Sequence, residues 1–184
     1  IKNPWPGMLL TLWGDDKKYK TVYWSKYTNC YYSGDYALRD DDGYLWLLGR
    51  ADDVLKIAGH RIGTAELESC IVSDDNVAES AVCGIPDEIK GEVIIAFIVL
   101  KDGITTSQVI LKKNIFTKIR TDIGAIATPK QIYFVSKLPK TRSGKIMRRL
   151  LKSIANGEAI GDTSTLDDAS AVTEIQKIVK ENSN

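Results

Sequence analysis

A loop with three positive charges around a glycine is the part of this sequence best suited to phosphate chemistry. It covers residues 140–145, reads KTRSGK, and lies between a predicted strand and a predicted helix. Gly144 allows a tight turn, so Lys145 can extend free of neighbouring side chains. A lysine presented in this way neutralises charge that develops when a carboxylate reacts with a phosphate. Taken alone, the segment more often indicates a solvated basic loop, or a nucleic-acid patch that continues into Arg148 and Arg149.

Two earlier segments carry side chains that suit a nucleotide. Asp35 follows a Ser-Gly pair beside a predicted strand. An aspartate there is often only a turn residue, but its carboxylate can accept both hydroxyls of a ribose, with Arg50 available for phosphate or ribose oxygens. Arg61 and His60 lie between two glycines just before a predicted helix, which leaves Arg61 free to pair with an anion. His60 is not assigned as a general base.

The elements that position these residues differ between the two parts of the chain. Residues 1–50 are predicted to be β-rich, with a strand at 8–13 and a hairpin formed by 31–38 and 44–48. All four tryptophans lie in the first 46 residues. This aromatic-rich part is expected to belong to a larger sheet rather than to form a complete domain.

From residue 52 onward, helices and strands alternate, which predicts an α+β fold with a three-stranded sheet flanked by helices. The predicted strands cover 77–85, 92–100 and 131–135, and the predicted helices begin at Thr64, Ser107 and Ile146. Residues after Gly157 are rich in Asp, Ser and Thr, and we expect them to be loosely held.

Composition restricts the classes of function. Lys and Arg number 25 against 24 Asp and Glu, which argues against a dedicated nucleic-acid or membrane-surface protein. Three widely spaced cysteines and one histidine cannot assemble a zinc ligand set, and reduced thiols are typical of a cytoplasmic protein. No apolar run reaches transmembrane length and no signal peptide is expected. The absence of an initiator Met at Ile1 favours a fragment.

Four separated segments together resemble the adenylate-forming enzymes, which include acyl-CoA synthetases, luciferases and the adenylation domains of peptide synthetases. These segments cover residues 33–35, 49–53, 56–66 and 139–149, in the order and spacing of that family. Within them, GHRIGTAE and PKTRSGKIMRR are most similar to the acetyl-CoA synthetase branch. The resemblance extends over nearly the whole chain.

The resemblance implies how the chain is divided. Residues 1–51 would be the β-rich C-terminal end of a large N-terminal adenylation domain, and 52–157 a mobile C-terminal domain with its hinge at Asp52. Residues 158–184 would be the loosely held tail. The family's phosphate-cradling loop and acyl pocket belong to the large domain and are not in this chain. We therefore expect residues 1–184 alone to be inactive.

The resemblance also implies a reaction in two steps. Acetate first attacks the α-phosphate of magnesium ATP, with Mg2+ as the metal cofactor, to form acetyl-adenylate. Lys145 would be required in this step, Asp35 would bind the ribose, and Arg50 and Arg61 would contact the nucleotide. The reaction needs the missing N-terminal domain as the partner of this segment.

Coenzyme A enters in the second implied step, after the C-terminal domain has rotated about Asp52. Ala58 and Gly59 correspond to the loop that faces the pantetheine tunnel, and Arg120 corresponds to an arginine that contacts the phosphates of coenzyme A. This rotation would withdraw the lysine loop and so let one cavity serve both steps.

Two further implications concern a metal and a modification. Val72, Asp74 and Val77 correspond to a metal position after the hinge helix, although family members often have His where Asp74 stands. Lys145 corresponds to a lysine that is switched by reversible acetylation, which implies a lysine acetyltransferase and a sirtuin-type deacetylase as partners.

Two alternatives stay open at this point. One is an acyl-CoA ligase for another short or medium carboxylate such as propionate, since the acyl pocket lies outside this sequence. The other is a non-enzymatic module that binds coenzyme A or a partner protein.

Overall fold

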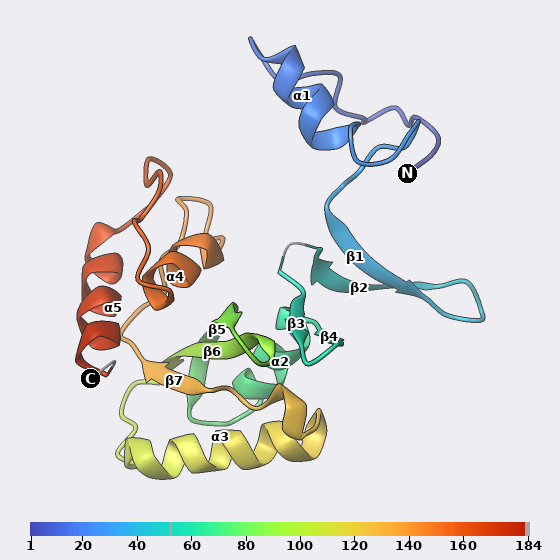
Figure 1. Cartoon of the computed structure of the whole chain (residues 1–184). Helices are drawn as coiled ribbons and strands as arrows, with labels where there is room; N and C mark the ends of the chain where they lie inside the picture. Colours follow the sequence, from blue (N-terminus) through green and yellow to red (C-terminus); the bar gives the residue numbers. More distant parts are fainter. Residues whose placement is uncertain (52, 183–184) are drawn as a thin grey trace. The chain divides into compact units, whose positions relative to one another are not determined.

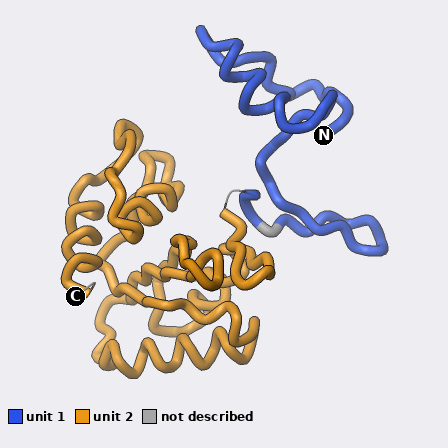
Figure 2. Tube along the Cα trace, viewed as in Figure 1, with its two compact units in different colours: residues 1–52 blue, residues 53–184 orange. Residues whose placement is uncertain are grey.

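The computed structural model describes residues 1–51 and 53–182, which divide into two compact units, residues 1–52 and 53–184 (Figure 2). Each unit is described by itself. Within the described residues, no helix combines the length and apolar character needed to cross a membrane.

The first unit consists of one helix, one hairpin and aromatic loops. Helix α1 (Asp16–Tyr23) begins after Asp15, whose side chain accepts a hydrogen bond from the Lys18 N–H at 2.9 Å. Strands β1 (Asp35–Arg39) and β2 (Leu45–Arg50) pair antiparallel in a two-stranded sheet. A cluster of aromatic rings centred on Tyr31 joins the helix to the N-terminal loop, with Tyr23 stacked on it and Trp5 and Trp24 edge-on.

The prediction of a strand at residues 8–13 was wrong, and helix α1 was not predicted from the sequence. Residues 8–13 have no strand partner among the described residues, and Leu10 and Trp13 are exposed. A β-strand is stable only when its backbone groups pair with a neighbour. Asp15 is the N-cap of α1, and Asp16 lies in its first turn, where an acidic side chain is favourable.

The second unit is built around one long central strand. Strand β6 (Gly91–Leu100) pairs antiparallel with β5 (Val77–Asp87) along one edge and parallel with β7 (Gln131–Phe134) through Ile95–Ile98. The short strands β3 (Leu55–Ile57) and β4 (His60–Ile62) extend the sheet in the order β4-β3-β6-β5 (Figure 1). The three predicted strands are confirmed, but the sheet has five.

Helices cover both faces of this sheet. The remaining elements are α2 (Thr64–Val72), α3 (Gln108–Asp122), the 3-10 helix η1 (Ala125–Ala127), α4 (Arg148–Ala155) and α5 (Ala169–Glu181). Ile94, Ala96 and Ile98 of β6 join the core formed with α2 and α3, whereas Ile95 and Phe97 join the core formed with α4 and α5. Burial on both faces explains why this strand is apolar at nearly every position.

The tail is more ordered than its composition predicts. Helix α5 buries one apolar face, formed by Ala171, Val172, Ile175 and Val179. Val172, Ile175 and Val179 belong to the same core as Leu150 and Leu151 of α4. The expectation of a loosely held segment was therefore wrong for residues 169–181, because an amphipathic helix can be stabilised by packing although the sequence before it is polar.

Candidate functional site

The lysine loop is a short hairpin whose backbone is well connected. Lys140 and Ile146 form an antiparallel bridge, and the Thr141 N–H donates to the Lys145 carbonyl at 2.8 Å. Gly144 has φ 82°, in the left-handed region that favours glycine, and its N–H donates to the Thr141 carbonyl at 2.8 Å. The predicted turn at Gly144 therefore forms, and it presents Lys145 at an exposed position.

The cations around this loop differ in their partners. Lys140 Nζ lies 2.7 Å from Glu79 Oε1, and Lys152 Nζ lies 3.5 Å from Glu92 Oε1. Lys145, by contrast, forms no ion pair with any residue that the structure describes. Its ammonium group can therefore reach a ligand without first breaking a salt bridge.

Asp35 and Arg50 lie together at one end of the β1–β2 hairpin. They are register partners, and Arg50 Nη1 is 3.7 Å from Asp35 Oδ1. The same guanidinium donates to the Ser33 carbonyl at 3.0 Å. A Cβ at Gly34 would stand 2.6 Å from Arg50 Nη2, so glycine is needed there for the arginine to lie across the backbone. Both charged side chains stay about half exposed (52% and 50%) and can accept a ligand.

Ala58 and Gly59 form the two-residue turn between β3 and β4. Their φ values, 47° and 85°, both lie in the left-handed region, as in a type I′ hairpin. The Ala58 N–H donates to the Lys90 carbonyl at 2.8 Å, which ties the turn to the loop between β5 and β6. A Cβ added to Gly59 meets no atom within 4 Å, so the turn faces open space.

A cleft of about 370 Å3 adjoins Ala58. Lys90 and Lys130 line it together with Thr128, whose buried hydroxyl has no hydrogen-bond partner among the described atoms. Asp87 also lines the cleft. Hydrogen bonds from the backbone N–H groups of Lys90 and Ile89 hold the pKa of the Asp87 carboxyl below its usual range. This charged and partly apolar hollow can hold part of a ligand.

The other predicted nucleotide and coenzyme A residues lie on exposed positions. Arg61 is on β4, opposite Lys56, and Arg120 is in the last turn of α3. Asp35 and Arg50 are brought together within the first unit, whereas Arg61, Lys145, Ala58 and Arg120 belong to the second unit. The predicted hinge, Asp52, lies outside the described residues.

The predicted metal position lies between α2 and β5. Val72 ends the helix, and the Asp74 carboxylate accepts hydrogen bonds from the Asn76 N–H at 2.9 Å and Asn76 Nδ2 at 2.8 Å. Val77 begins β5 and is buried. A search of the described residues finds no group of three or more His, Cys, Asp or Glu side chains that could hold a metal ion.

The ion pair between Glu68 and Arg148 was also missed by sequence reasoning. Arg148 forms a bidentate ion pair with Glu68, in which Nε lies 2.9 Å from Oε1 and Nη2 lies 2.6 Å from Oε2. Arg148 Nη1 also lies 3.9 Å from Asp53 Oδ2. Glu68 raises the pKa of Arg148, and its carboxylate also accepts the Val82 N–H at 2.8 Å. The pair is 80 residues apart in the chain, so no local pattern could reveal it.

Comparison with known families identifies the central part of the second unit. Residues 66–145 match the family model described as the AMP-binding enzyme C-terminal domain. This segment is similar to an AMP-binding enzyme C-terminal domain. The match includes all of α2 except its first two residues, the sheet strands β5 to β7 and the lysine loop.

Relatives with known names resemble the chain well beyond this C-terminal domain. The chain is 58% identical over 181 residues to an acetyl-coenzyme A synthetase of Pyrobaculum arsenaticum, a match that covers 98% of the chain and 27% of the relative. It is 50% identical over 177 residues to a 3-hydroxypropionyl-coenzyme A synthetase of Metallosphaera sedula. That match covers 96% of this chain and 26% of the relative. The chain therefore spans about a quarter of the length of these proteins.

Solved structures agree with the fold. Acetoacetyl-CoA synthetase from Streptomyces lividans matches 98% of this chain and 27% of its own with a TM-score of 0.84, at 23% identity. The anthranilate CoA ligase AuaEII, in complex with anthranoyl-AMP, matches 80% of this chain and 28% of its own with a TM-score of 0.70, at 35% identity. The α+β fold and the resemblance to adenylate-forming enzymes are confirmed.

Proposed function

We propose that this chain is part of an enzyme that converts acetate, ATP and coenzyme A into acetyl-CoA, AMP and pyrophosphate through acetyl-adenylate. The observation that carries the proposal is the 58% identity to an acetyl-coenzyme A synthetase over nearly the whole chain. The exposed Lys145, held on an ordered hairpin, supports it. The reaction takes place in the cytoplasm and requires the large adenylation domain, to which residues 1–51 belong.

In the first step, an acetate oxygen attacks the α-phosphorus of ATP, and the bond to the β-phosphate oxygen breaks to release pyrophosphate. Lys145 donates to the reacting oxygens and neutralises their charge, while Mg2+ enters as the magnesium complex of ATP. Asp35 accepts the ribose hydroxyls. Arg50, anchored by the Ser33 carbonyl, contacts the nucleotide together with Arg61.

In the second step, the sulfur of coenzyme A attacks the acetyl carbonyl and AMP leaves. Residues 52–157 rotate about Asp52, which withdraws Lys145 and brings the Ala58–Gly59 turn to the pantetheine. Open space at Gly59 leaves room for a narrow thiol channel. Arg120 binds the phosphates of coenzyme A. Val72, Asp74 and Val77 would hold the metal ion that the resemblance implies, with Asp74 as the single side-chain carboxylate among them.

Acetylation of Lys145 would control the first step, because it removes the positive charge beside the α-phosphate. Lys140 and Lys152 are engaged by Glu79 and Glu92, so Lys145 is the better target for a lysine acetyltransferase. A sirtuin-type deacetylase would restore activity.

The two half-reactions test the proposal in the full-length enzyme. Lys145→Ala should abolish acetate-dependent exchange of pyrophosphate into ATP while leaving thioester formation from supplied acetyl-adenylate largely intact. Gly59→Leu should do the reverse, because a large side chain with φ 85° is strained and would obstruct the channel. Equal loss of both half-reactions in both variants would contradict the two-step use of this domain.

A second candidate substrate is supported by the relative from Metallosphaera sedula, whose name refers to 3-hydroxypropionate. Measuring kcat/KM of the full-length enzyme for acetate, propionate and 3-hydroxypropionate decides between them. A preference for acetate of less than about tenfold, the discrimination expected for one methylene group, would favour a broader short-chain ligase.

A further inference from the structure

The lysine hairpin pairs with a segment of the tail that lies beyond α4. Thr141 and Leu166 form an antiparallel bridge. The Arg142 N–H donates to the Thr165 carbonyl at 3.3 Å, and the Asp167 N–H donates to the Lys140 carbonyl at 2.9 Å. The first arm of the hairpin therefore has backbone partners on both sides: the tail on one side and residues 145–146 on the other.

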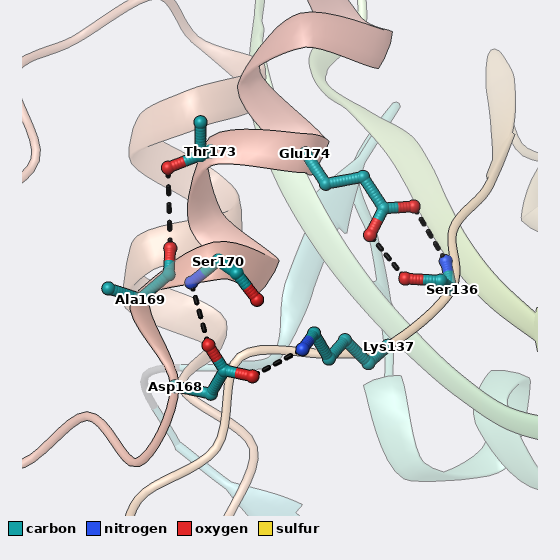
Figure 3. Close-up of polar contacts among 7 residues, drawn as sticks. All are labelled: Ser136, Lys137, Asp168, Ala169, Ser170, Thr173 and Glu174. Carbon is teal, nitrogen blue, oxygen red and sulfur yellow. Dashed lines mark hydrogen bonds and ion pairs between the residues drawn. The ribbon is translucent and has the colours of Figure 1, made fainter.

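Helix α5 holds the chain just before this arm through two carboxylates (Figure 3). The Glu174 carboxylate accepts a hydrogen bond from the Ser136 N–H at 2.9 Å and another from the Ser136 hydroxyl. The Asp168 carboxylate accepts one from Lys137 Nζ and another from the Ser170 N–H, the latter at 2.8 Å. Hydrogen bonds from Lys137 and Ser170 lower the pKa of Asp168 to about 2, so this carboxylate remains ionised at neutral pH.

Apolar packing fixes α5 itself. Val172, Ile175 and Val179 are buried in the core that contains Leu150 and Leu151 of α4. Helix α4 begins at Arg148, directly after the hairpin. The chain is thus held to the tail both before the hairpin, at residues 136–142, and after it, through α4.

We propose that residues 163–181, the brace, are a positioning element for Lys145, with Asp168 and Glu174 as its positioning residues. The inference rests on the proposed function of Lys145 in adenylate formation. A hairpin that contains Ser143 and Gly144 has considerable conformational freedom when it is unsupported. When the first arm is already fixed, no substrate-binding energy is needed to order the lysine. A displacement of about 1 Å in a group of this kind can lower the rate about 100-fold.

The test removes the two side-chain contacts but leaves the helix in place. In Asp168→Asn, the amide oxygen still caps α5 while the ion pair with Lys137 is lost. Glu174→Ala removes both contacts to Ser136. The matched control is Glu181→Gln, on the same helix, where the carboxylate pairs only with Lys177 at 3.9 Å among the described residues.

Two measurements are made on these variants. The double variant combines Asp168→Asn with Glu174→Ala. In this variant, amide hydrogen exchange of the 184-residue chain should become at least about tenfold faster at residues 141–147, with the protection of α5 unchanged. In the full-length enzyme, the double variant should lower kcat for pyrophosphate exchange by about 10- to 100-fold. Thioester formation from supplied acetyl-adenylate should stay within about twofold. Asp168→Asn alone should give a smaller effect in the same direction, and Glu181→Gln none.

The outcomes separate this inference from the proposed function. If amide hydrogen exchange at residues 141–147 is unchanged, or if both half-reactions are lost equally, the inference that the brace positions Lys145 is overturned. Intact pyrophosphate exchange in the double variant also overturns it when Lys145→Ala abolishes that exchange, while the proposed function stands. If Lys145→Ala is active, the proposed role of Lys145 fails, and faster amide exchange at 141–147 then still supports a brace that orders this hairpin.

Discussion

The two units handle their apolar side chains in opposite ways. In the second unit, Phe97 and Ile132 are completely buried between helices on either face of the sheet. In the first unit, Leu10 is 88% exposed, Trp13 is fully exposed, and Leu47 of the hairpin is 76% exposed. An isolated two-stranded hairpin is marginally stable, and a large apolar surface usually marks an interface. The second unit therefore contains its own core, whereas the first unit is expected to depend on further contacts.

The largest expected contrast comes from truncating one aromatic side chain in each unit. Phe97→Ala should lower the free energy of unfolding of the second unit by about 3–5 kcal/mol, because Phe97 is fully buried and stacks on Tyr133 at 5.4 Å. Trp13→Ala should change that of the first unit by less than about 0.5 kcal/mol. Urea titrations followed by circular dichroism and tryptophan fluorescence measure the two effects. Equal effects would remove the contrast.

Cysteine reactivity gives the next contrast. Burial raises the pKa of the Cys83 thiol to about 12, which lowers its thiolate fraction by about a thousandfold relative to an ordinary cysteine. Cys30 of the first unit is only half-buried. At pH 8, iodoacetamide should label Cys30 at least about 100-fold faster than Cys83, as measured by peptide mass spectrometry. In denaturing urea the two rates should converge, and comparable native rates would contradict the burial of Cys83.

Ion pairs should give a smaller contrast. Glu68 and Arg148 are mostly buried (side chains 12% and 27% exposed), so Glu68→Gln should destabilise the second unit by about 2 kcal/mol. Asp35→Asn removes the half-exposed partner of Arg50 and should cost less than about 1 kcal/mol. The same urea titrations measure both. A larger cost for Asp35→Asn would show that the first unit has more internal stability than its exposed surface indicates.

The smallest expected difference is between the unfolding midpoints of the wild-type chain. All four tryptophans lie in the first unit, so their fluorescence reports that unit, whereas circular dichroism at 222 nm reports mainly α2 to α5 of the second. The fluorescence midpoint in urea should be lower by about 1 M. Superimposable transitions would indicate that the two units unfold together.

Local patterns were sufficient wherever a short segment contains its own physical reason. The strand predicted at 92–100 formed as β6, and the helix predicted to begin at Ser107 formed as α3, whose Leu111, Ile115 and Ile119 are buried on one face. Local patterns failed where only a few residues carry the signal. Strands β3 and β4 have three residues each, too few to show an alternating apolar pattern. The turn between them was missed as well, because Ala58 is not a residue type that indicates a positive φ angle.

The sequence by itself determined the α+β class, the family resemblance and the chemical character of the lysine loop, because each depends on residue types at short spacing. Only the tertiary structure decided which lysine and arginine side chains in and near the lysine loop are free of ion pairs with the described residues and can therefore contact a ligand. It paired Lys140 with Glu79 and Arg148 with Glu68, residues that are 61 and 80 positions apart, and left Lys145 exposed. It also placed α5 against α4 and Asp168 beside Lys137. Such contacts depend on how distant segments pack, and packing is decided by the whole core rather than by any window of the chain.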